Sequence, residues 1–408
     1  MSHQRIAVVG GGIGGVATVA ALRAGGYAGE VVLIDRAAFP YDRPPLSKDY
    51  LAGTRDLKQI ALQQPEWYAD QRVELIGDAD VVAVEPAADT VMISLADGQV
   101  ISADHVVLAT GGRAVRPPIP GSGSARVFVI RDAEDADRLR AVLETTDAPR
   151  LLVVGGGLVG AETASTALGL GASVVLVDPL DPPLAAAVGP TVARFLHDQH
   201  AAHGIETLAT VLESVQETPR GIAAQLRGED QAREFDAIVI GVGMSPRTEL
   251  AEAAGLEVDR GVLVDAGQTT SHPRVLAIGD CARLRDHHRA EHWEAAQHDG
   301  QRAAATILGA AAPARTASWW WSDRHHRHVE GTGTMRAADG THTVVARGEI
   351  GDGPFAVFTL RGDVVIGAVA VDDSNAVRAA RRMIDRGTVV DPEKLADPQT
   401  DLRKLLRG

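Results

Sequence analysis

The stretch that decides the fold is LLVVGGGLVGAETASTALGLGASVVLVD, residues 151–178. Residues 6–35, IAVVGGGIGGVATVAALRAGGYAGEVVLID, repeat its pattern: an apolar run, Gly-x-Gly-x-x-Gly, an Ala- and Leu-rich stretch, a second apolar run and a terminal Asp. This order predicts a strand, a turn, a helix and a strand, the unit that binds dinucleotides. A single copy is also typical of an ordinary strand-to-helix corner. Two copies in full context predict two dinucleotide sites.

Six glycines form the two motifs: Gly10, Gly12, Gly15, Gly155, Gly157 and Gly160. In each motif the first glycine is expected to make the tight turn, the second to let backbone approach a pyrophosphate, and the third to let helix pack closely on strand. The free N–H groups at the helix N-terminus favour phosphate. Asp35 and Asp178 stand 20 and 18 residues past the third glycine, where an acid accepts hydrogen bonds from an adenosine ribose.

Length and composition agree with this organisation. A chain of 408 residues predicts two to three domains, and 45% hydrophobic residues supply packed cores. No apolar run approaches the roughly 20 residues that span a bilayer, and an early first strand leaves no room for a signal peptide, so a cytoplasmic protein is expected. The net charge of −14 disfavours nucleic acid and membrane surfaces as partners.

Cys281 is the only cysteine. Enzymes with paired FAD and NAD(P) domains often relay electrons through two neighbouring thiols, and a single thiol excludes that chemistry within the subunit. Cys281 follows the segment VLAIGD, where a helix is expected to start. A peroxide-sensing thiol and a small packed residue are both open interpretations, and packing is favoured.

The 14 histidines include two clusters. They are His287, His288, His292 and His298, and His325, His326 and His328. Neither cluster has a recognised ligand spacing, so a solvated basic face is favoured and no metal site is predicted.

Motifs along nearly the whole chain resemble the FAD-dependent NADH:ferredoxin reductases that serve bacterial oxygenases. The motifs, in order, are VVGGGIGG, RPPLSKDYL, VVLATGGR, VVGGGLVGAETA, VIGVGMSPRTELAEAAGLEV, GVLVDAGQTTSHPRVLAIGDCA, EHWEAAQHDGQRAAATILG and WWWSD. The resemblance implies an α/β fold with two Rossmann-like dinucleotide-binding domains, as in glutathione reductase, and an α+β C-terminal domain. It places the FAD-binding domain in residues 1–113 and 244–316, the NAD-binding domain in 114–243 and the C-terminal domain in 317–408.

The resemblance also implies cofactor contacts, residue by residue. For FAD they are Gly10, Gly12, Gly14, Gly15, Asp35, Arg43, Lys48, Val81, Thr110, Arg131, Asp280 and Trp293. For NADH they are Gly155, Gly157, Gly160, Glu162, Asp178 and Gly243. Judged from the sequence alone, Val81 is typical of a core residue. Asp280, an acid directly after a buried strand, indicates a ligand instead.

Lys48 and Glu162 are the expected catalytic residues. Reduced flavin carries negative charge that a cation stabilises, and an acid can position the nicotinamide carboxamide. The alternative is that Glu162 is an ordinary acid in the first turn of a helix, stabilised by the helix dipole.

The segment after the second acid departs from the family pattern. Pro183 and Ala187 stand where the family commonly has arginines, which leaves NADH affinity open. The same loss argues against NADPH, because its 2′-phosphate needs a nearby Arg and Asp178 would repel it.

The expected function is therefore an FAD flavoprotein that takes a hydride from NADH and passes single electrons to an iron–sulfur ferredoxin, which feeds a monooxygenase or dioxygenase. A rubredoxin reductase, an NADH oxidase and a partner-binding flavoprotein like the apoptosis-inducing ones remain alternatives. Arg315 and the run 324–328, RHHRH, form a concentrated basic stretch beside three tryptophans. This stretch is the expected dock for an acidic ferredoxin, and a solvated loop remote from the dock is the alternative.

Overall fold

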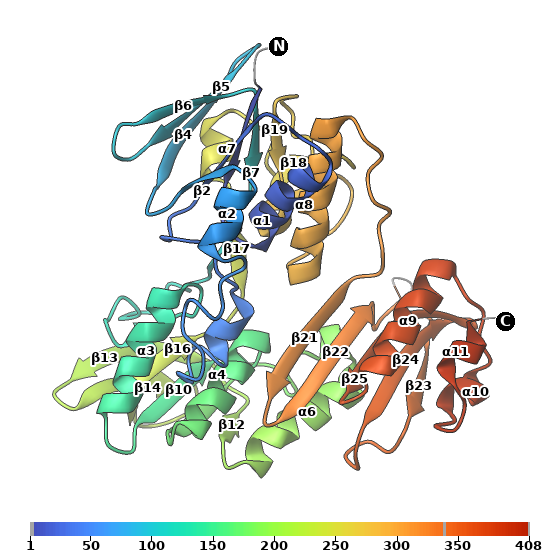
Figure 1. The fold of residues 1–408 in the computed structure, drawn as a ribbon. Helices are drawn as coiled ribbons and strands as arrows, with labels where there is room; N and C mark the ends of the chain where they lie inside the picture. The colour runs from blue at the N-terminus through green and yellow to red at the C-terminus, as the bar shows by residue number, and fades with distance from the viewer. Residues whose placement is uncertain (1–3, 338–339, 407–408) are drawn as a thin grey trace. The chain divides into compact units, whose positions relative to one another are not determined.

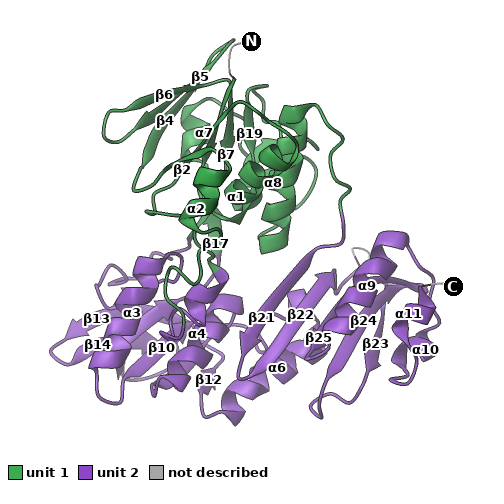
Figure 2. Cartoon of the chain, viewed as in Figure 1, with its two compact units in different colours: residues 1–43, 55–113, 244–315 green, residues 44–54, 114–243, 316–408 purple. Residues whose placement is uncertain are grey.

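The computed structural model describes residues 4–337 and 340–406, which form two compact units (Figure 2). Unit 1 comprises residues 1–43, 55–113 and 244–315, and unit 2 comprises 44–54, 114–243 and 316–408. The expected NAD-binding and C-terminal domains thus fall in one unit, together with the short segment 44–54. The division into three domains stays a prediction, and its outer limits, residues 1 and 408, lie outside the described residues.

A five-stranded parallel sheet forms the centre of unit 1, in the order β19-β7-β1-β2-β3. Its strands, in chain order, are β1 (Arg5–Val9), β2 (Glu30–Ile34), β3 (Val73–Ile76), β7 (His105–Leu108) and β19 (Val275–Ala277). Most of their side chains are buried, as expected for a parallel sheet covered on both faces.

Helices α1 (Ile13–Ala24) and α8 (Trp293–Leu308) of unit 1 lie side by side (Figure 1). A Cβ on Gly300 of α8 would stand 2.4 Å from the carbonyl oxygen of Gly14, so the two backbones approach closely. The other elements of unit 1 are α2 (Pro65–Asp70), the antiparallel sheet β4 (Val81–Pro86), β5 (Val91–Leu95) and β6 (Val100–Ala103), then β17 (Met244–Pro246), α7 (Glu249–Ala253), β18 (Val262–Val264), η2 (Gly279–Cys281) and β20 (Ala282–Leu284). Strand β8 (Gly112–Ala114) pairs with β17 where the chain leaves this unit.

Unit 2 contains a second parallel sheet, in the order β12-β11-β10-β16-β9. Its strands are β9 (Val127–Phe128), β10 (Arg150–Val154), β11 (Ser173–Val177), β12 (Glu206–Leu208) and β16 (Ala237–Ile240). Helices α3 (Ala133–Thr145), α4 (Leu158–Gly169), α5 (Ala185–Val188) and α6 (Pro190–Ala202) belong to this part, as do the antiparallel strands β13 (Leu212–Thr218), β14 (Gly221–Leu226) and β15 (Arg233–Phe235). The short helix η1 (Pro44–Ser47) packs against α4.

The C-terminal part of unit 2 is an antiparallel sheet in the order β21-β22-β25-β24-β23. Its elements are β21 (Trp319–Arg324), β22 (Arg327–Gly333), β23 (Thr343–Arg347), β24 (Phe355–Arg361), β25 (Val364–Val371), α9 (Ser374–Arg386), α10 (Pro392–Ala396) and α11 (Leu402–Leu405).

Alternation along the strands of this sheet explains why it joins unit 2. On β24, Phe355 and Val357 pack with residues of α5 and α6, whereas Phe358 and Leu360 pack with residues of α9. Successive side chains of a strand point to opposite faces, so both faces of the sheet are covered by helices. The predicted fold class, two Rossmann-like domains and an α+β C-terminal domain, is confirmed.

Across residues 4–337 and 340–406, the helices are all too short or too polar to traverse a lipid bilayer.

Candidate functional site

The first glycine turn lies between β1 and α1 in unit 1. Gly10 has φ of +113°, a conformation open to glycine, and a Cβ on Gly15 would stand 2.0 Å from the carbonyl oxygen of Gly10. At Gly12, by contrast, a Cβ would meet no atom of the described residues within 4 Å. The turn is therefore closed where helix meets strand and open where a pyrophosphate would lie.

Asp35 follows β2 and faces this turn. The backbone N–H groups of Arg36, Gly11 and Ala37 act on its carboxylate and favour the ionised form. Burial raises the pKa of Asp35, and the nearby Arg43 and these backbone donors oppose that shift only in part. The acid is thus held at the turn, as adenosine recognition requires.

The second glycine turn, between β10 and α4 of unit 2, repeats this geometry. Gly155 has φ of +103°, and a Cβ on Gly160 would stand 2.0 Å from the Gly155 carbonyl oxygen. Among the residues that the structure describes, a Cβ on Gly157 would meet only the Gly241 carbonyl oxygen, at 3.7 Å. Asp178 accepts hydrogen bonds from the backbone N–H of Gly156 and of Leu180, both at 2.8 Å.

Neither α1 nor α4 has a side-chain cap at its N-terminus, where Gly12 and Gly157 are the capping residues. The first N–H groups of each helix are therefore open to a phosphate. Room at the second glycine, uncapped N–H groups and a held acid fit a dinucleotide at each turn.

The remaining residues expected to bind FAD are divided between the two units. Unit 1 contains Arg43, Val81, Thr110, Asp280 and Trp293 besides the glycines and Asp35, whereas unit 2 contains Lys48 and Arg131.

Within unit 1, hydrogen bonds position the side chains of Trp293 and Thr110. The indole N–H of Trp293, the first residue of α8, donates to Asp42 at 2.8 Å, and the Thr110 hydroxyl donates to the Arg247 carbonyl at 2.8 Å. Val81 begins β4, and Asp280 lies in η2.

Two predicted cofactor residues of unit 2 lie at backbone turns and helix ends. The backbone N–H of Arg131 donates to Asp135 at 3.1 Å, at the N-terminus of α3. Gly243 has φ of +119°, and its carbonyl oxygen accepts a hydrogen bond from the N–H of Val115.

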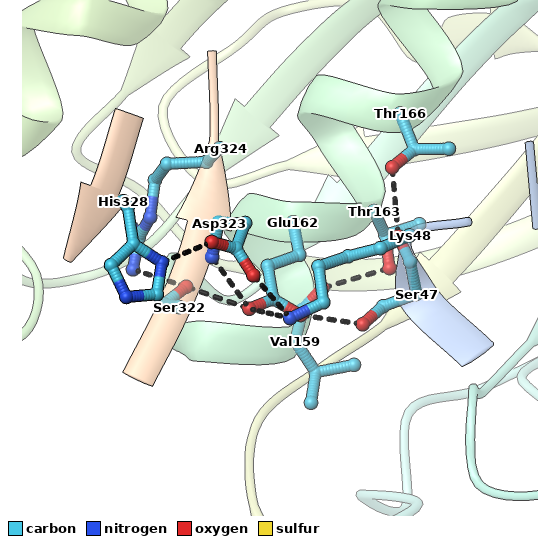
Figure 3. A network of polar contacts seen from close by, with 10 residues as sticks. All are labelled: Ser47, Lys48, Val159, Glu162, Thr163, Thr166, Ser322, Asp323, Arg324 and His328. Atoms are coloured by element: carbon cyan, nitrogen blue, oxygen red, sulfur yellow. Dashed lines mark hydrogen bonds and ion pairs between the residues drawn. The ribbon is translucent and has the colours of Figure 1, made fainter. Parts of the chain in front are cut away.

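Glu162 is the centre of a polar network in unit 2, drawn in Figure 3. The residue is only 5% exposed, and each of its carboxylate oxygens accepts hydrogen bonds. The Ser47 hydroxyl donates to one oxygen at 2.6 Å, and the Ser322 hydroxyl donates to the other at 2.7 Å. The backbone N–H of Asp323 also donates to Glu162, at 3.3 Å. The carboxylate thus joins η1, α4 and β21.

Lys48 lies between two carboxylates. Its ammonium is 3.5 Å from Glu162 and 2.9 Å from Asp323, and it lies 5.6 Å from the centre of the Trp321 ring. The Lys48 side chain is 14% exposed. Hydrogen bonds from His328 and Lys48 hold the pKa of Asp323 below its ordinary value, although burial acts in the opposite direction. The structure therefore brings together Lys48 and Glu162, the two residues expected to be catalytic.

The alternative interpretation of Glu162 as a first-turn acid is wrong. Helix α4 begins at Leu158, and its first turn contains no acidic residue. Glu162 is the fifth residue of the helix, because the helix starts directly after the glycine turn. Its charge is stabilised by side-chain partners rather than by the helix terminus.

The expected exposed basic dock at residues 324–328 is also wrong for its first two members. Arg324 is 4% exposed and His325 is 6% exposed. The Arg324 guanidinium donates to the Ser322 hydroxyl at 3.1 Å, and burial lowers its pKa to about 10. His325 contacts His200 of α6, so the solvated face expected for this cluster does not include it.

Three residues of the network were not predicted as site residues: Ser47, Ser322 and Asp323. His328 was predicted only as part of the basic dock, not as a member of this network. Ser47 precedes the predicted Lys48, and Ser322 and Asp323 belong to the motif WWWSD, so both motifs contained the signal. Both serines donate to Glu162, and that shared contact is visible only in the fold.

Cys281 ends the single turn η2 and is fully buried. Its thiol contacts the carbonyl oxygens of Ile278 and Leu108, at 3.2 and 3.4 Å, and burial raises its pKa. A raised pKa and no exposure suit a packed residue rather than a reactive thiol.

The segment after Asp178 contains Pro183 and Ala187 at the positions of the missing arginines. Pro183 is close to the second glycine turn, where a Cβ on Gly156 would be 2.6 Å from its ring. Arg194 of α6 pairs with Asp181 at 2.7 Å. The arginine adjoining this segment is thus already paired with an acid.

No group of three or more His, Cys, Asp or Glu side chains that could hold a metal ion occurs in the part of the chain that the structure describes.

Comparisons with known proteins cover nearly the whole chain. The family model of pyridine nucleotide-disulphide oxidoreductases matches residues 4–300, and the reductase C-terminal model matches residues 319–406. The chain is 35% identical to the ferredoxin–NAD(+) reductase component of an anthranilate 1,2-dioxygenase system from Burkholderia cepacia, over 100% of both proteins. It is 31% identical to a putidaredoxin reductase from Pseudomonas putida, over 99% of this chain and 97% of that protein.

A solved structure agrees with these relatives. The covalent putidaredoxin reductase–putidaredoxin complex contains a chain that matches with a TM-score of 0.92 and 29% identity, covering 100% of this chain and 99% of that one.

Proposed function

Because the chain belongs to the pyridine nucleotide-disulphide oxidoreductase family, we propose that it carries electrons from NADH through FAD to an iron–sulfur ferredoxin that serves an oxygenase. The expected family is confirmed, and FAD and NAD(H) are its cofactors. The observation that carries the proposal is the pair of matching glycine turns, each with an open second glycine and a held acid.

The overall reaction balances without a thiol. NADH gives up a hydride, two oxidised ferredoxins take one electron each, and NAD⁺, two reduced ferredoxins and one proton result. Bound FAD supplies the exchange between a two-electron donor and one-electron acceptors. The buried, high-pKa Cys281 contributes no second redox group.

The site residues are assigned roles on their geometry. The first turn and Asp35 would hold the adenosine and pyrophosphate of FAD, and the second turn and Asp178 would hold those of NADH. We assign the same binding roles to the other residues predicted from the resemblance.

Lys48 and Glu162 would orient the reacting rings. Glu162 is fixed by two hydroxyls and one backbone N–H, so its carboxylate is oriented before a ligand arrives. Lys48 is fixed by two carboxylates and supplies a positive charge that needs no rearrangement. We further propose that the enzyme works in the cytoplasm, which suits its NADH substrate and its single unpaired cysteine.

Reduction of a two-iron ferredoxin by NADH, followed by absorbance under anaerobic conditions, tests the proposal. We expect turnover that requires FAD and ferredoxin together, with two ferredoxins reduced per NADH. Reduction of rubredoxin but not ferredoxin would favour a rubredoxin reductase, and peroxide formation without any acceptor preference would favour an NADH oxidase. Absence of NADH oxidation by the FAD-loaded protein would favour the partner-binding class.

A further inference from the structure

His328 extends the network of Glu162 and Lys48 toward solvent. It lies on β22 directly opposite Asp323 of β21, as a cross-strand pair. Its Nδ1 is 2.5 Å from Asp323, and its Nε2 is 3.5 Å from Glu330, two residues further along its own strand. One ring therefore lies beside two carboxylates, and only the doubly protonated ring presents an N–H toward each of them.

We propose that His328 is a positioning residue whose protonated ring holds Asp323 toward Lys48, so that Lys48 stays beside Glu162 only while the ring carries its charge. The proposal rests on the proposed reductase function, because it assigns the proton state of His328 a role in accepting the hydride of NADH. A chain of four groups, from His328 through Asp323 and Lys48 to Glu162, carries the effect (Figure 3).

The charges around the chain of four groups balance only with a protonated His328. The acids are Glu162 of α4, Asp323 of β21 and Glu330 of β22, and the cations are Lys48 beside η1 and Arg324 of β21. Arg327 also lies on β22, next to His328, but it pairs with Asp372 at 2.8 Å, so those two charges cancel. A neutral His328 leaves three acids against two cations, and its proton makes the numbers equal.

The direction of titration agrees with this balance. Burial acts to lower the pKa of His328, but Asp323 and Glu330 outweigh it, and the pKa lies above its ordinary value. The protonated ring is thus present below this raised pKa and is lost as pH rises through it. The His328 side chain is 40% exposed, so bulk protons can reach it.

Three variants separate charge from shape. His328→Gln retains a donor but never carries the charge, and His328→Lys carries the charge throughout the range from pH 6 to 9. Arg327→Gln is the matched control, because it removes a cation from the neighbouring position without touching Asp323.

The first measurement needs no cofactor turnover. Ring resonances of His328 are followed by NMR against pH in histidine-labelled protein and assigned by their absence from His328→Gln. We expect a pKa above 6.5 that falls by about one unit in Asp323→Asn and moves much less in Arg327→Gln. A ring that titrates at or below 6.5, or that ignores Asp323→Asn, overturns the proposal.

The second measurement is the limiting rate of FAD reduction by NADH in stopped flow, from pH 6 to 9. The wild type should lose activity above the His328 pKa, His328→Lys should keep it, and His328→Gln should be low throughout, by about tenfold at pH 6. A shared high-pH fall in wild type and His328→Lys would contradict the proposal. Failure of the ferredoxin assay with an intact NMR titration would instead refute the proposed function.

Discussion

Glu162 carries its charge in the interior, at 5% exposure, between Lys48 and the buried Arg324. A buried ion costs several kcal/mol of desolvation unless other groups replace the lost water. Ser47, Ser322 and a backbone N–H make that replacement. The arrangement leaves Arg324 dependent on Glu162, because no residue that the structure describes offers the guanidinium Nε a hydrogen-bond partner.

Glu162→Gln should therefore destabilise the protein and slow hydride acceptance together. The variant removes the charge that Arg324 and Lys48 face, and breaking one partner of a buried pair costs about 3 kcal/mol. Urea unfolding measures the loss in free energy, and stopped-flow reduction by NADH should fall by at least about tenfold. Glu144→Gln, on the exposed side of α3, is the control and should change neither. Unaltered reduction in Glu162→Gln would remove Glu162 from the catalytic site.

Asp178 should set the preference for NADH. Its two oxygens are held by backbone N–H groups, and the adjoining Arg194 is paired with Asp181. We expect kcat/KM for NADH to exceed that for NADPH by more than about tenfold, because a 2′-phosphate would meet this carboxylate. Asp178→Ala should narrow the ratio, and equal efficiency of the wild type with both nucleotides would disprove the assignment.

At the scale of elements, the run 324–328 forms the tight connection between β21 and β22. His325 and His326 both have positive φ, 50° and 58°, which matches a two-residue hairpin loop but is costly for residues other than glycine. Contacts with two helices offset this cost. The His325 backbone N–H donates to Ser165 of α4, and its ring meets His200 of α6 at 2.9 Å. The basic run 324–328 is therefore a tight turn whose first two residues, Arg324 and His325, are buried.

The histidine contact predicts acid sensitivity. Burial, chiefly, lowers the pKa of His200 to about 2 and that of His325 to about 4. Below the unfolded pKa of about 6.5, the unfolded chain binds protons that the folded chain does not, so stability falls from pH 6.5 toward pH 4. The unfolding free energy of the wild type should drop between pH 7 and 4 by of order 6 kcal/mol more than that of His200→Gln/His325→Gln, about 3 kcal/mol for each histidine. Replacement of the exposed His287 is the control, and parallel pH curves for wild type and double variant would contradict the expectation.

At the scale of the whole molecule, the chain divides its chemistry between two units. Unit 1 holds the first glycine turn, and unit 2 holds the second turn and the Glu162 network. The C-terminal sheet belongs to unit 2 because α6 packs on one of its faces, while α9 packs on the other. Strand β21 of this sheet therefore supplies Ser322 and Asp323 to the network around Glu162 of α4.

Binding of FAD should raise the unfolding free energy of the protein. The Gly12→Val variant should lose this increase but keep the stability of the apoprotein. At a hundredfold excess over Kd, FAD adds about 2.7 kcal/mol to the unfolding free energy. A Cβ at Gly12 meets no atom of the described residues within 4 Å, and Gly12 has an ordinary φ of −69°, so the apoprotein should stay stable while the valine fills the phosphate space. Thermal unfolding with and without FAD tests this, with Gly123→Val as the control at another open glycine. If FAD still raised the unfolding free energy of Gly12→Val, the pyrophosphate would have to bind at another site.

The two dinucleotide-binding folds could be predicted from the sequence alone. Each strand-turn-helix-strand motif is a local pattern of about 30 residues, in which the glycine spacing, the helix start and the terminal acid follow one another along the chain. The sequence also singled out Lys48 and Glu162, which the structure brings together, and favoured packing for Cys281, which is buried. Only the tertiary structure decided that Glu162 meets Ser322, 160 residues away, and that Arg324 and His325 are buried. Charge in a sequence indicates exposure on average, but burial depends on which distant elements supply partners, and here α4 and α6 supplied them.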